Sequence, residues 1–360
     1  MIAKLARPML MLFGVVLMSA SLPAAGSAQD LSPVEKIYAD LAKLPPDQRH
    51  DKLVEGARKE GKLVMVHTWT TPLAKPHIEL FKKTYPFIDV DWNDMGSQDA
   101  AERFVDEETA GKHLTDLLSL AVYDMQAILD GNFAARYRTP ATDAIQPRYR
   151  GFGDSQNRWT PYYVSDMGIT YNPTMIKPED APKDWFDLCK PAFKGSVSFD
   201  PATVRFLVGL DAMMGDAKMQ QWLECIGKND PIVQPTMADR FQLMLAGDHI
   251  AQGQNYIYYC FAAKAKNPNT PCAAVLNVPL IGLAGAMVIS RNAQHPYAAA
   301  LMVDWSLSDE SQRYTAKNFR GPLTIKHPYL PDDAQLIAAP LPDKAEVDKV
   351  LGYWKKYIGK

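Results

Sequence analysis

Short apolar runs with strand character alternate with helical patterns along most of this chain, and that alternation limits the fold more than any other feature. In the first half, strand-like runs at residues 62–67, 87–92 and 117–120 alternate with helical patterns at residues 76–85 and 100–110. Such alternation is typical of a parallel sheet with helices on both faces. The sequence therefore predicts an α/β fold.

The later half of the chain carries a second set of the same signals. Residues 159–171 are expected to form paired strand segments, and residues 195–199, 254–259 and 285–290 single strands. The helical patterns of this half occupy residues 204–214, 238–246, 296–307 and 310–317. We therefore expect a second sheet with its own carboxyl edge. The chain of 360 residues is also longer than one hydrophobic core usually serves, which favours two domains.

The first residues have the pattern of an export signal. Lys4 and Arg7 precede an uncharged apolar run at residues 9–18, and small residues follow at 24–28, so cleavage is expected after Ala28. The run is shorter than the roughly 20 residues that span a bilayer. No cysteine stands at its exit, which argues against a lipid tether. We expect a soluble mature protein.

Net charge and cysteine content narrow the function classes. The formal net charge of −2 becomes −4 without Lys4 and Arg7, and no dense Lys/Arg block offers a surface for nucleic acid. The four cysteines fit no CxxC pattern, and in an oxidising compartment disulfides are expected. The sequence does not decide their pairing; we favour Cys189 with Cys225 and Cys260 with Cys272 over the alternatives.

Polar and aromatic residues gather where the predicted strands end. Ligands of parallel sheets bind at the carboxyl ends of strands. These ends carry Thr68, Trp69, Thr70, Thr71, Gly96, Ser97 and Tyr123. Trp69 offers a flat apolar face among hydroxyls, with Tyr256 and Tyr258 as an opposing wall, and such a pocket suits a small organic molecule. Core packing is the alternative for each of these aromatic residues.

A second candidate site precedes the predicted helix at residues 204–214. Asp200 and Thr203 lie just before it and Arg205 at its start. Free N–H groups at a helix N-terminus favour anions, and Arg205 could hold a carboxylate or phosphonate with two hydrogen bonds. The alternatives are an ordinary N-cap for Thr203 and a solvated surface position for Arg205.

Several short motifs, in order and spacing, resemble the type 2 periplasmic binding proteins of the iron(III)-binding and family 1 extracellular solute-binding group. The resemblance covers roughly residues 52–326. It rests on residues 57–64 (ARKEGKLV), 84–86 (TYP), 171–172 (YN), 177–185 (KPEDAPKDW), 193–195 (FKG), 245–248 (LAGD), 286–290 (AMVIS) and 306–312 (SLSDESQ).

This resemblance implies a periplasmic-binding-protein type II fold, in which two lobes, each a mostly parallel sheet flanked by helices, are joined by a two-strand hinge near residues 163–169 and 277–285. The expected division is a signal peptide (1–28), an N-terminal helical segment (29–61), lobe I (62–165), lobe II (166–278), a return to lobe I (279–330) and a C-terminal helical tail (331–360). It also implies a monomer in the periplasm that passes a small-molecule ligand to an inner-membrane ABC permease with its ATPase.

For the ligand we favour a small organic molecule with an anionic group, with no cofactor. Iron(III) is the alternative, because iron-binding members of the group offer two adjacent tyrosines. The alignment places Tyr256-Ile257 there, and the tandem pair Tyr258-Tyr259 on a strand would point to opposite faces. His67, at the end of the first strand, would complete this metal set; a partly buried structural histidine is its alternative role.

Catalysis is not expected. GxSxG, HExxH and Walker motifs are absent, and the seven histidines form no close pair. A secreted hydrolase using Asp166 and Asp200, or a binding protein that serves a sensor, are the remaining alternatives.

Overall fold

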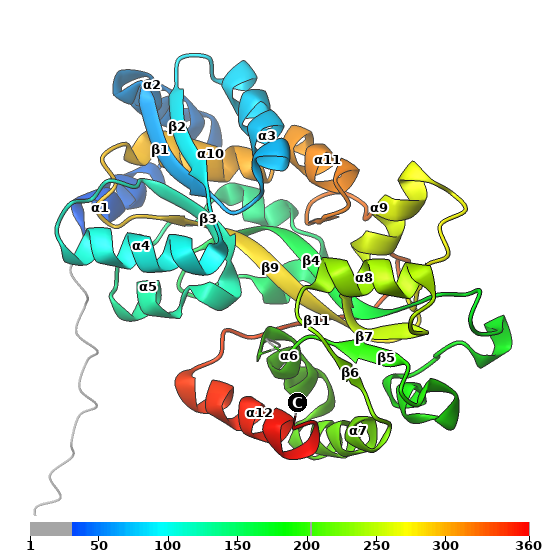
Figure 1. The fold of residues 1–360 in the computed structure, drawn as a ribbon. Coiled ribbons are helices and arrows are strands. Elements are labelled where there is room, and N and C mark those ends of the chain that lie inside the picture. Colours follow the sequence, from blue (N-terminus) through cyan, green and yellow to red (C-terminus); the bar gives the residue numbers. More distant parts are fainter. Residues whose placement is uncertain (1–30, 202–203, 360) are drawn as a thin grey trace, which may run out of the picture. The chain divides into compact units, whose positions relative to one another are not determined.

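Two long antiparallel strands, β4 (Thr160–Tyr171) and β9 (Leu280–Ile289), run through the middle of the molecule (Figure 1). The computed structural model describes residues 31–201 and 204–359, and the elements below belong to the unit that begins at Ser32. Residues 159–171 thus form one strand and not the paired segments that we expected, because β4 pairs with β9 along most of its length. The predicted signal peptide and its cleavage point lie outside the described residues.

The strands of the described residues belong to one sheet with the order β2-β1-β3-β9-β4-β7-β5-β6, and β8, β10 and β11 pair with β4 or β9 beside this path. The neighbours β2, β1 and β3 are parallel, as are β7, β5 and β6, while β3–β9, β9–β4 and β4–β7 are antiparallel. The other strands are β1 (Lys62–His67), β2 (Asp89–Asp94), β3 (Leu117–Ala121), β5 (Val197–Phe199), β6 (Ile232–Val233), β7 (Ala251–Tyr256), β8 (Ala273–Ala274), β10 (Gly321–Pro322) and β11 (Leu336–Ala338). The two predicted sheets are thus the two parallel parts of one continuous sheet, because β4 and β9 hydrogen-bond to strands of both halves.

The two halves nevertheless have separate main cores. One core includes Leu63, Phe81 and Leu301, and the other includes Phe206 and Trp222. β4 serves both, since its first part buries Tyr162 and Val164 in the first core and its second part buries Met167 and Ile169 in the second. β9 also contributes to both cores, with its first part in the second core and its last part in the first core. We call the half around the first core lobe I and the other lobe II; β4 and β9 are the hinge strands that join them.

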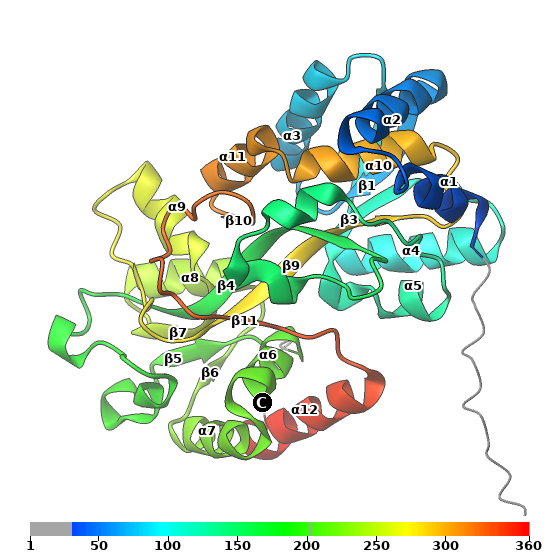
Figure 2. The same ribbon diagram turned by 180° about the vertical axis from the view of Figure 1, so that it is seen from behind.

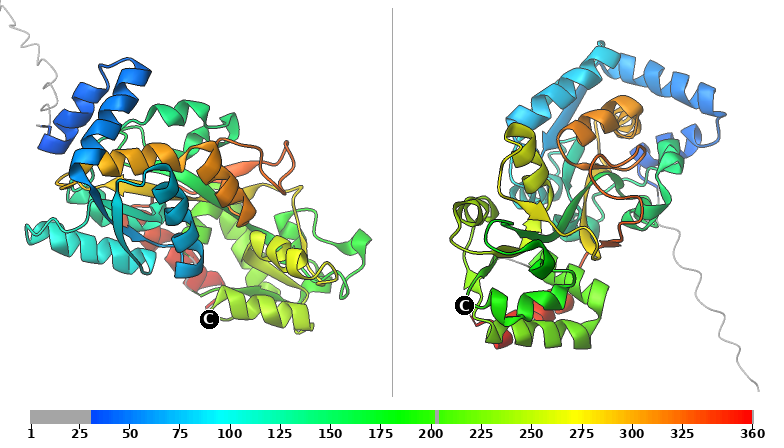
Figure 3. Two further views of the ribbon diagram at one scale, coloured as in Figure 1. Left: turned by 90° about the horizontal axis from the view of Figure 1, so that it is seen from above. Right: turned by 90° about the vertical axis from the view of Figure 1, so that its right-hand side faces the viewer.

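Helices cover the sheet in lobe I. They are α1 (Pro33–Leu41), α2 (Pro46–Glu60), α3 (Thr71–Thr84), α4 (Ser97–Thr109), α5 (Gln126–Asp130), α10 (Pro296–Ser306) and α11 (Asp309–Lys317). The N-terminal helical pair is structural: α2 (blue) lies alongside α10 (orange), as Figure 3 shows. At their contact a Cβ on Gly56 would lie 2.3 Å from the ring of Tyr297, so only glycine permits this close approach.

Lobe II is built from α6 (Val204–Met214), α7 (Asp216–Lys228), α8 (Met237–Ala246), α9 (Tyr258–Lys266) and α12 (Lys344–Tyr357). Short 3₁₀ helices are η1 (Val122–Asp124), η2 (Pro140–Ala144), η3 (Pro147–Phe152), η4 (Pro178–Asp180), η5 (Trp185–Cys189) and η6 (Pro191–Phe193). The predicted strand over residues 254–259 is wrong at its end. Pairing with β4 stops at Tyr256, Ile257 has a helical backbone, and α9 begins at Tyr258.

Both disulfides lie in lobe II and confirm the favoured pairing. Cys189–Cys225 joins η5 to α7, and Cys260–Cys272 joins α9 to the segment before β8. Each bridge therefore ties a loop or short helix to a longer helix of the same lobe.

A third segment crosses between the lobes behind the hinge strands (Figure 2). It begins at β10, which pairs with β4 at Tyr163 and Val164, and it continues to β11, which pairs with β9. The chain then ends in α12, whose side chains Val350 and Trp354 are buried in the core of lobe II. The C-terminal tail is thus part of lobe II.

Within the described residues, no helix combines the length and the apolar character that crossing a bilayer requires.

Candidate ligand-binding site

The carboxyl ends of strands from both lobes meet at the middle of the hinge strands. β3 ends at Ala121, which is opposite Gly285 of β9, and Gly285 is in turn opposite Tyr163 of β4. From the other side, β7 ends at Tyr256, opposite Met167 of β4. Strand ends of this kind are where open α/β sheets bind ligands.

A small cavity of ≈ 50 Å³ lies at this meeting point. It has room for a group of a few atoms, such as a carboxylate. Both lobes contribute to its lining, which consists of Ala121, Val122, Tyr123, Tyr163, Ser165, Arg205, Tyr256, Leu283, Ala284, Ala339 and Pro340. Three residues predicted to bind ligand, Tyr123, Arg205 and Tyr256, are thus brought together from η1, α6 and β7.

Arg205 supplies the positive charge of the cavity. Its Nη1 donates to the Tyr256 hydroxyl at 3.3 Å, and its guanidinium carbon lies 5.8 Å from the centroid of the Tyr123 ring. The pKa of Arg205 is raised, first by its charge interaction with Tyr256 and further by Asp124, against the effect of burial. Among the described residues no carboxylate forms an ion pair with this guanidinium. An anion in the cavity would therefore meet a cation with free donors.

A row of stacked tyrosines leads away from Tyr256. The Tyr256 and Tyr258 ring centroids are 5.5 Å apart, and those of Tyr258 and Tyr259 are 4.9 Å apart. Above Tyr258 lies Arg320, with its guanidinium carbon 3.8 Å from the ring centroid. Burial raises the pKa of Tyr258, and the charge of Arg320 opposes that rise.

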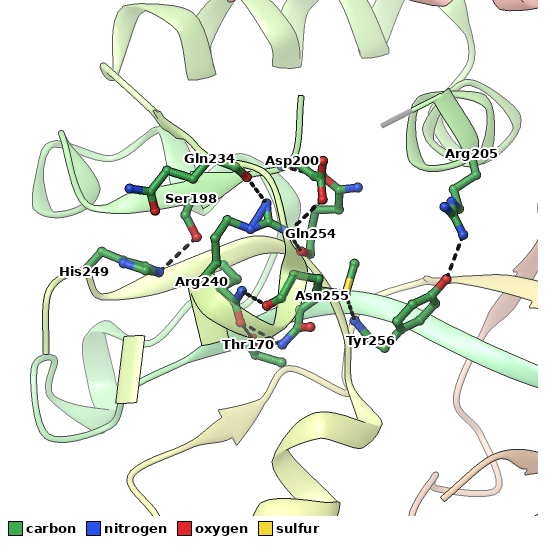
Figure 4. Close-up of polar contacts among 12 residues, drawn as sticks. Thr170, Ser198, Asp200, Arg205, Gln234, Arg240, His249, Gln254, Asn255 and Tyr256 are labelled. Atoms are coloured by element: carbon green, nitrogen blue, oxygen red, sulfur yellow. Dashed lines mark hydrogen bonds and ion pairs between the residues drawn. The ribbon is translucent and has the colours of Figure 1, made fainter. Parts of the chain in front are cut away.

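Asp200 and Gln254 take part in a polar network with Arg240 at the end of β5 (Figure 4). The fully buried Arg240 of α8 forms an ion pair with the Asp200 carboxylate at 3.7 Å, and it donates to the carbonyl of Gln254 at 3.4 Å. Gln254 Oε1 accepts from the Asp200 N–H at 3.0 Å. This network fixes the end of β5, and so the point from which the chain proceeds to Arg205. Thr203, the predicted cap, lies outside the described residues.

Trp69 packs in the core of lobe I, with only 4% of its surface exposed. Its ring contacts those of His67, His77, Tyr162, Tyr163 and Tyr314. Of these neighbours Tyr163 lines the cavity, so Trp69 supports the cavity wall from behind. This is the core position that we gave as its alternative.

The other strand-end residues of lobe I take different places. Ser97 Oγ accepts from the Ala121 N–H at 3.0 Å, which brings it close to the cavity lining. Thr68 is half-buried, and Thr70 is exposed at the start of α3.

The residues of the alternative metal set occupy two different environments. His67 is buried beside Trp69 and accepts from the Trp69 N–H through Nδ1 at 3.1 Å, and burial lowers its pKa to about 3. Tyr258 and Tyr259 lie in the first turn of α9, with stacked rings, and not on the strand that we expected. Across residues 31–201 and 204–359, no group of three or more His, Cys, Asp or Glu side chains is arranged to hold a metal ion.

Tyr163 and Arg320 are among the residues at or beside this site that the sequence did not predict as ligand-binding. Tyr163 lines the cavity, whereas the sequence places it only in the hinge segment. Arg320 follows α11 in a turn, and no local pattern distinguishes it from other surface arginines. Only the pairing of β10 with β4 brings it to the tyrosine row.

A sequence profile of bacterial extracellular solute-binding proteins matches residues 112–347. The chain belongs to this family. No curated protein sequence matches it. Its fold is the type II periplasmic-binding-protein fold that the motifs implied, as solved structures of other solute-binding proteins show.

Three of these solved structures illustrate the range of the fold. IdiA (FutA) of Trichodesmium, in complex with iron and citrate, is 12% identical and covers 83% of this solute-binding protein and 100% of its own chain, with a TM-score of 0.70. The substrate-binding protein PotD of a spermidine/putrescine ABC transporter of Streptococcus pneumoniae is 17% identical and covers 82% of this chain and 99% of its own chain, with a TM-score of 0.65. AfuA of Actinobacillus pleuropneumoniae, with fructose-6-phosphate bound, is 17% identical. It covers 83% of this chain and 98% of its own chain, with a TM-score of 0.64.

Proposed function

We propose that this solute-binding protein captures a small organic anion between its lobes and delivers it to an ABC permease in the inner membrane. The observation that carries the proposal is Arg205, whose guanidinium lines the cavity at the strand ends and has no carboxylate partner among the described residues. A half-buried cation of this kind is stabilised by a ligand anion. Tyr123 and Tyr256 would add hydroxyls and ring faces to the contact.

The rest of the proposal follows from the sequence and the family. Residues 1–28 would direct export to the periplasm, and the mature chain would act there as a monomer without catalysis. Two of the solved relatives support an anionic ligand, since AfuA holds fructose-6-phosphate and IdiA (FutA) holds citrate together with iron.

The test is a thermal-shift and calorimetry screen of the mature protein against organic acids, phosphonates, sugar phosphates, polyamines and iron(III). A ligand present at 100 times its Kd stabilises the folded state by about 2.7 kcal/mol. In Arg205→Gln we expect affinity for the anion to fall by about 10- to 100-fold, because a hydrogen bond to a charged group is lost.

Arg313→Gln is the matched control, because Arg313 is an exposed arginine of α11 paired with Asp309. Its affinity should equal that of the unmodified protein. Equal affinities for all three proteins would show that Arg205 does not bind the ligand. Stabilisation by iron(III) alone, with tyrosinate colour that Tyr258→Phe abolishes, would replace the organic anion by iron(III) as cargo.

A further inference from the structure

A second arginine lies over the middle ring of the tyrosine row, and it comes from a different part of the chain. Arg205 belongs to α6 of lobe II, and its side chain contacts Tyr256. Arg320 directly precedes β10, which is paired with β4 at Tyr163 and Val164, and it contacts Tyr258. Because Tyr256 and Tyr258 stack on each other, the two guanidiniums are connected through two phenol rings.

The two positive charges act on the same part of the site. Burial raises the pKa of Tyr163, and the charges of both Arg320 and Arg205 oppose that rise. Tyr163 lines the cavity, so both guanidiniums lie within electrostatic reach of one cavity residue. Tyr163 also packs against Gly285, where a Cβ would lie 1.9 Å from its ring, so the ring is closely confined.

Arg320 is held in place without being neutralised. Its backbone N–H donates to the Thr315 carbonyl at 3.1 Å, and the preceding carbonyl, that of Phe319, accepts from the Tyr329 hydroxyl at 2.8 Å. The side chain is half-buried, and in the part of the chain that the structure describes no carboxylate forms an ion pair with it. An arginine stacked on an aromatic ring in this way keeps its in-plane N–H donors available for an anion.

Resting on the proposed function, we propose that the ligand is a small organic dianion, with one anionic group bound by Arg205 and the other by Arg320, across the Tyr256–Tyr258 stack. The two cations then set both the charge and the length of the ligand. A monoanion satisfies only Arg205, and a dianion that is too short leaves Arg320 without a partner. Contacts from α6 and from the segment joined to β4 also make the dianion a bridge between lobe II and the hinge.

The experiment compares dicarboxylates from malonate to adipate with monocarboxylates of the same carbon number, by calorimetry on the mature protein. A phosphorylated hydroxy acid, 3-phosphoglycerate, is added as a ligand that carries one carboxylate and one phosphate group. We expect one dianion length to bind at least about tenfold more tightly than its monocarboxylate, which corresponds to one additional charged contact.

Four variants assign this preference. Arg320→Gln should remove it and leave monocarboxylate affinity unchanged, whereas Arg205→Gln should weaken both classes. Arg320→Lys retains the charge and should keep part of the preference, which separates charge from any effect of the substitution on folding. Arg313→Gln should behave like the unmodified protein.

The outcomes separate the two proposals. A preference that survives in Arg320→Gln, or equal affinity for monoanions and dianions, would overturn the dianion inference while leaving Arg205 as the anion contact. Binding of monocarboxylates alone would have the same meaning. Failure of every anion, with binding of another class of compound, would overturn both proposals.

Discussion

His67 and His77 lie side by side in the core of lobe I, with ring centroids 5.9 Å apart. Burial lowers the pKa of His67 to about 3, and it lowers that of His77 well below the ordinary value. In the unfolded chain a histidine takes up its proton near pH 6.5. Between pH 6.5 and about 3 the unfolded state therefore binds more protons, and the free energy of unfolding must fall as the pH falls.

We predict that His67→Asn flattens this pH dependence. One histidine contributes a slope of about 1.4 kcal/mol per pH unit well below pH 6.5. The Asn amide oxygen can accept from the Trp69 N–H as His67 Nδ1 does. Urea unfolding between pH 4 and 7 measures the slope, and His50→Asn, at an exposed position, is the control. An unchanged slope in His67→Asn would show that His67 is protonated in the folded protein.

At the scale of single residues, the sequence predicted the segments that reach the site. It predicted less well which side chains of these segments face the site. Arg205, Tyr123 and Tyr256 reach the cavity lining, because each stands just beyond a strand or at a helix start. Trp69 stands at an equivalent strand end, yet it turns into an aromatic core whose other members come from α3, β4 and α11. Packing partners so distant in sequence leave no local pattern.

At the scale of elements, the disulfide Cys260–Cys272 holds the helix that begins with Tyr258. The bridge spans 12 residues and Cys189–Cys225 spans 36, so loop-closure entropy gives stabilisations of about 3 and 4 kcal/mol respectively. Only the shorter bridge fixes an element of the tyrosine row.

We therefore predict that the Cys260→Ala/Cys272→Ala variant loses both stability and ligand affinity, whereas Cys189→Ala/Cys225→Ala loses stability alone. Urea unfolding measures the first quantity and calorimetry the second, at a temperature where both variants are folded. If the two variants lose affinity equally, the position of α9 does not depend on its bridge.

The boundary between β7 and α9 shows why elements near the site are harder to predict than those in the core. Aromatic residues at 256, 258 and 259 favour a strand by propensity. The strand ends at Tyr256 because pairing with β4 ends there, and the following residues form a helix. By contrast, the bounds of β1 and α6 agree with the sequence patterns, since their apolar periodicity reports directly on burial.

At the scale of the whole molecule, lobe II is completed by the last helix of the chain. Trp354 of α12 is buried against the core that contains Phe199, although the two residues are 155 positions apart in the sequence. Local sequence patterns predicted two cores, but they predicted neither the continuous sheet nor the packing of the last helix on lobe II. A short stretch of sequence carries no information on which distant segments pair.

We predict that Trp354→Ala destabilises the protein by about 3–5 kcal/mol, as expected for a large buried aromatic side chain. Leu351→Ala on the same helix is the control, because Leu351 is 36% exposed and its loss should cost less than about 1 kcal/mol. The midpoints of urea unfolding compare the two variants. Similar midpoints would mean that α12 is not a necessary part of the lobe II core.

The segment that returns from β10 to β11 has a mechanical consequence. Two strands side by side permit both bending and twisting at their middle, but here a third segment is hydrogen-bonded to β4 at one end and to β9 at the other. Twisting would shear those hydrogen bonds, whereas bending across the sheet leaves them intact. We therefore expect the lobes to rotate about a single axis, as a door does, and one pair of dyes, placed on α3 and α8, should follow this motion as a change in one distance.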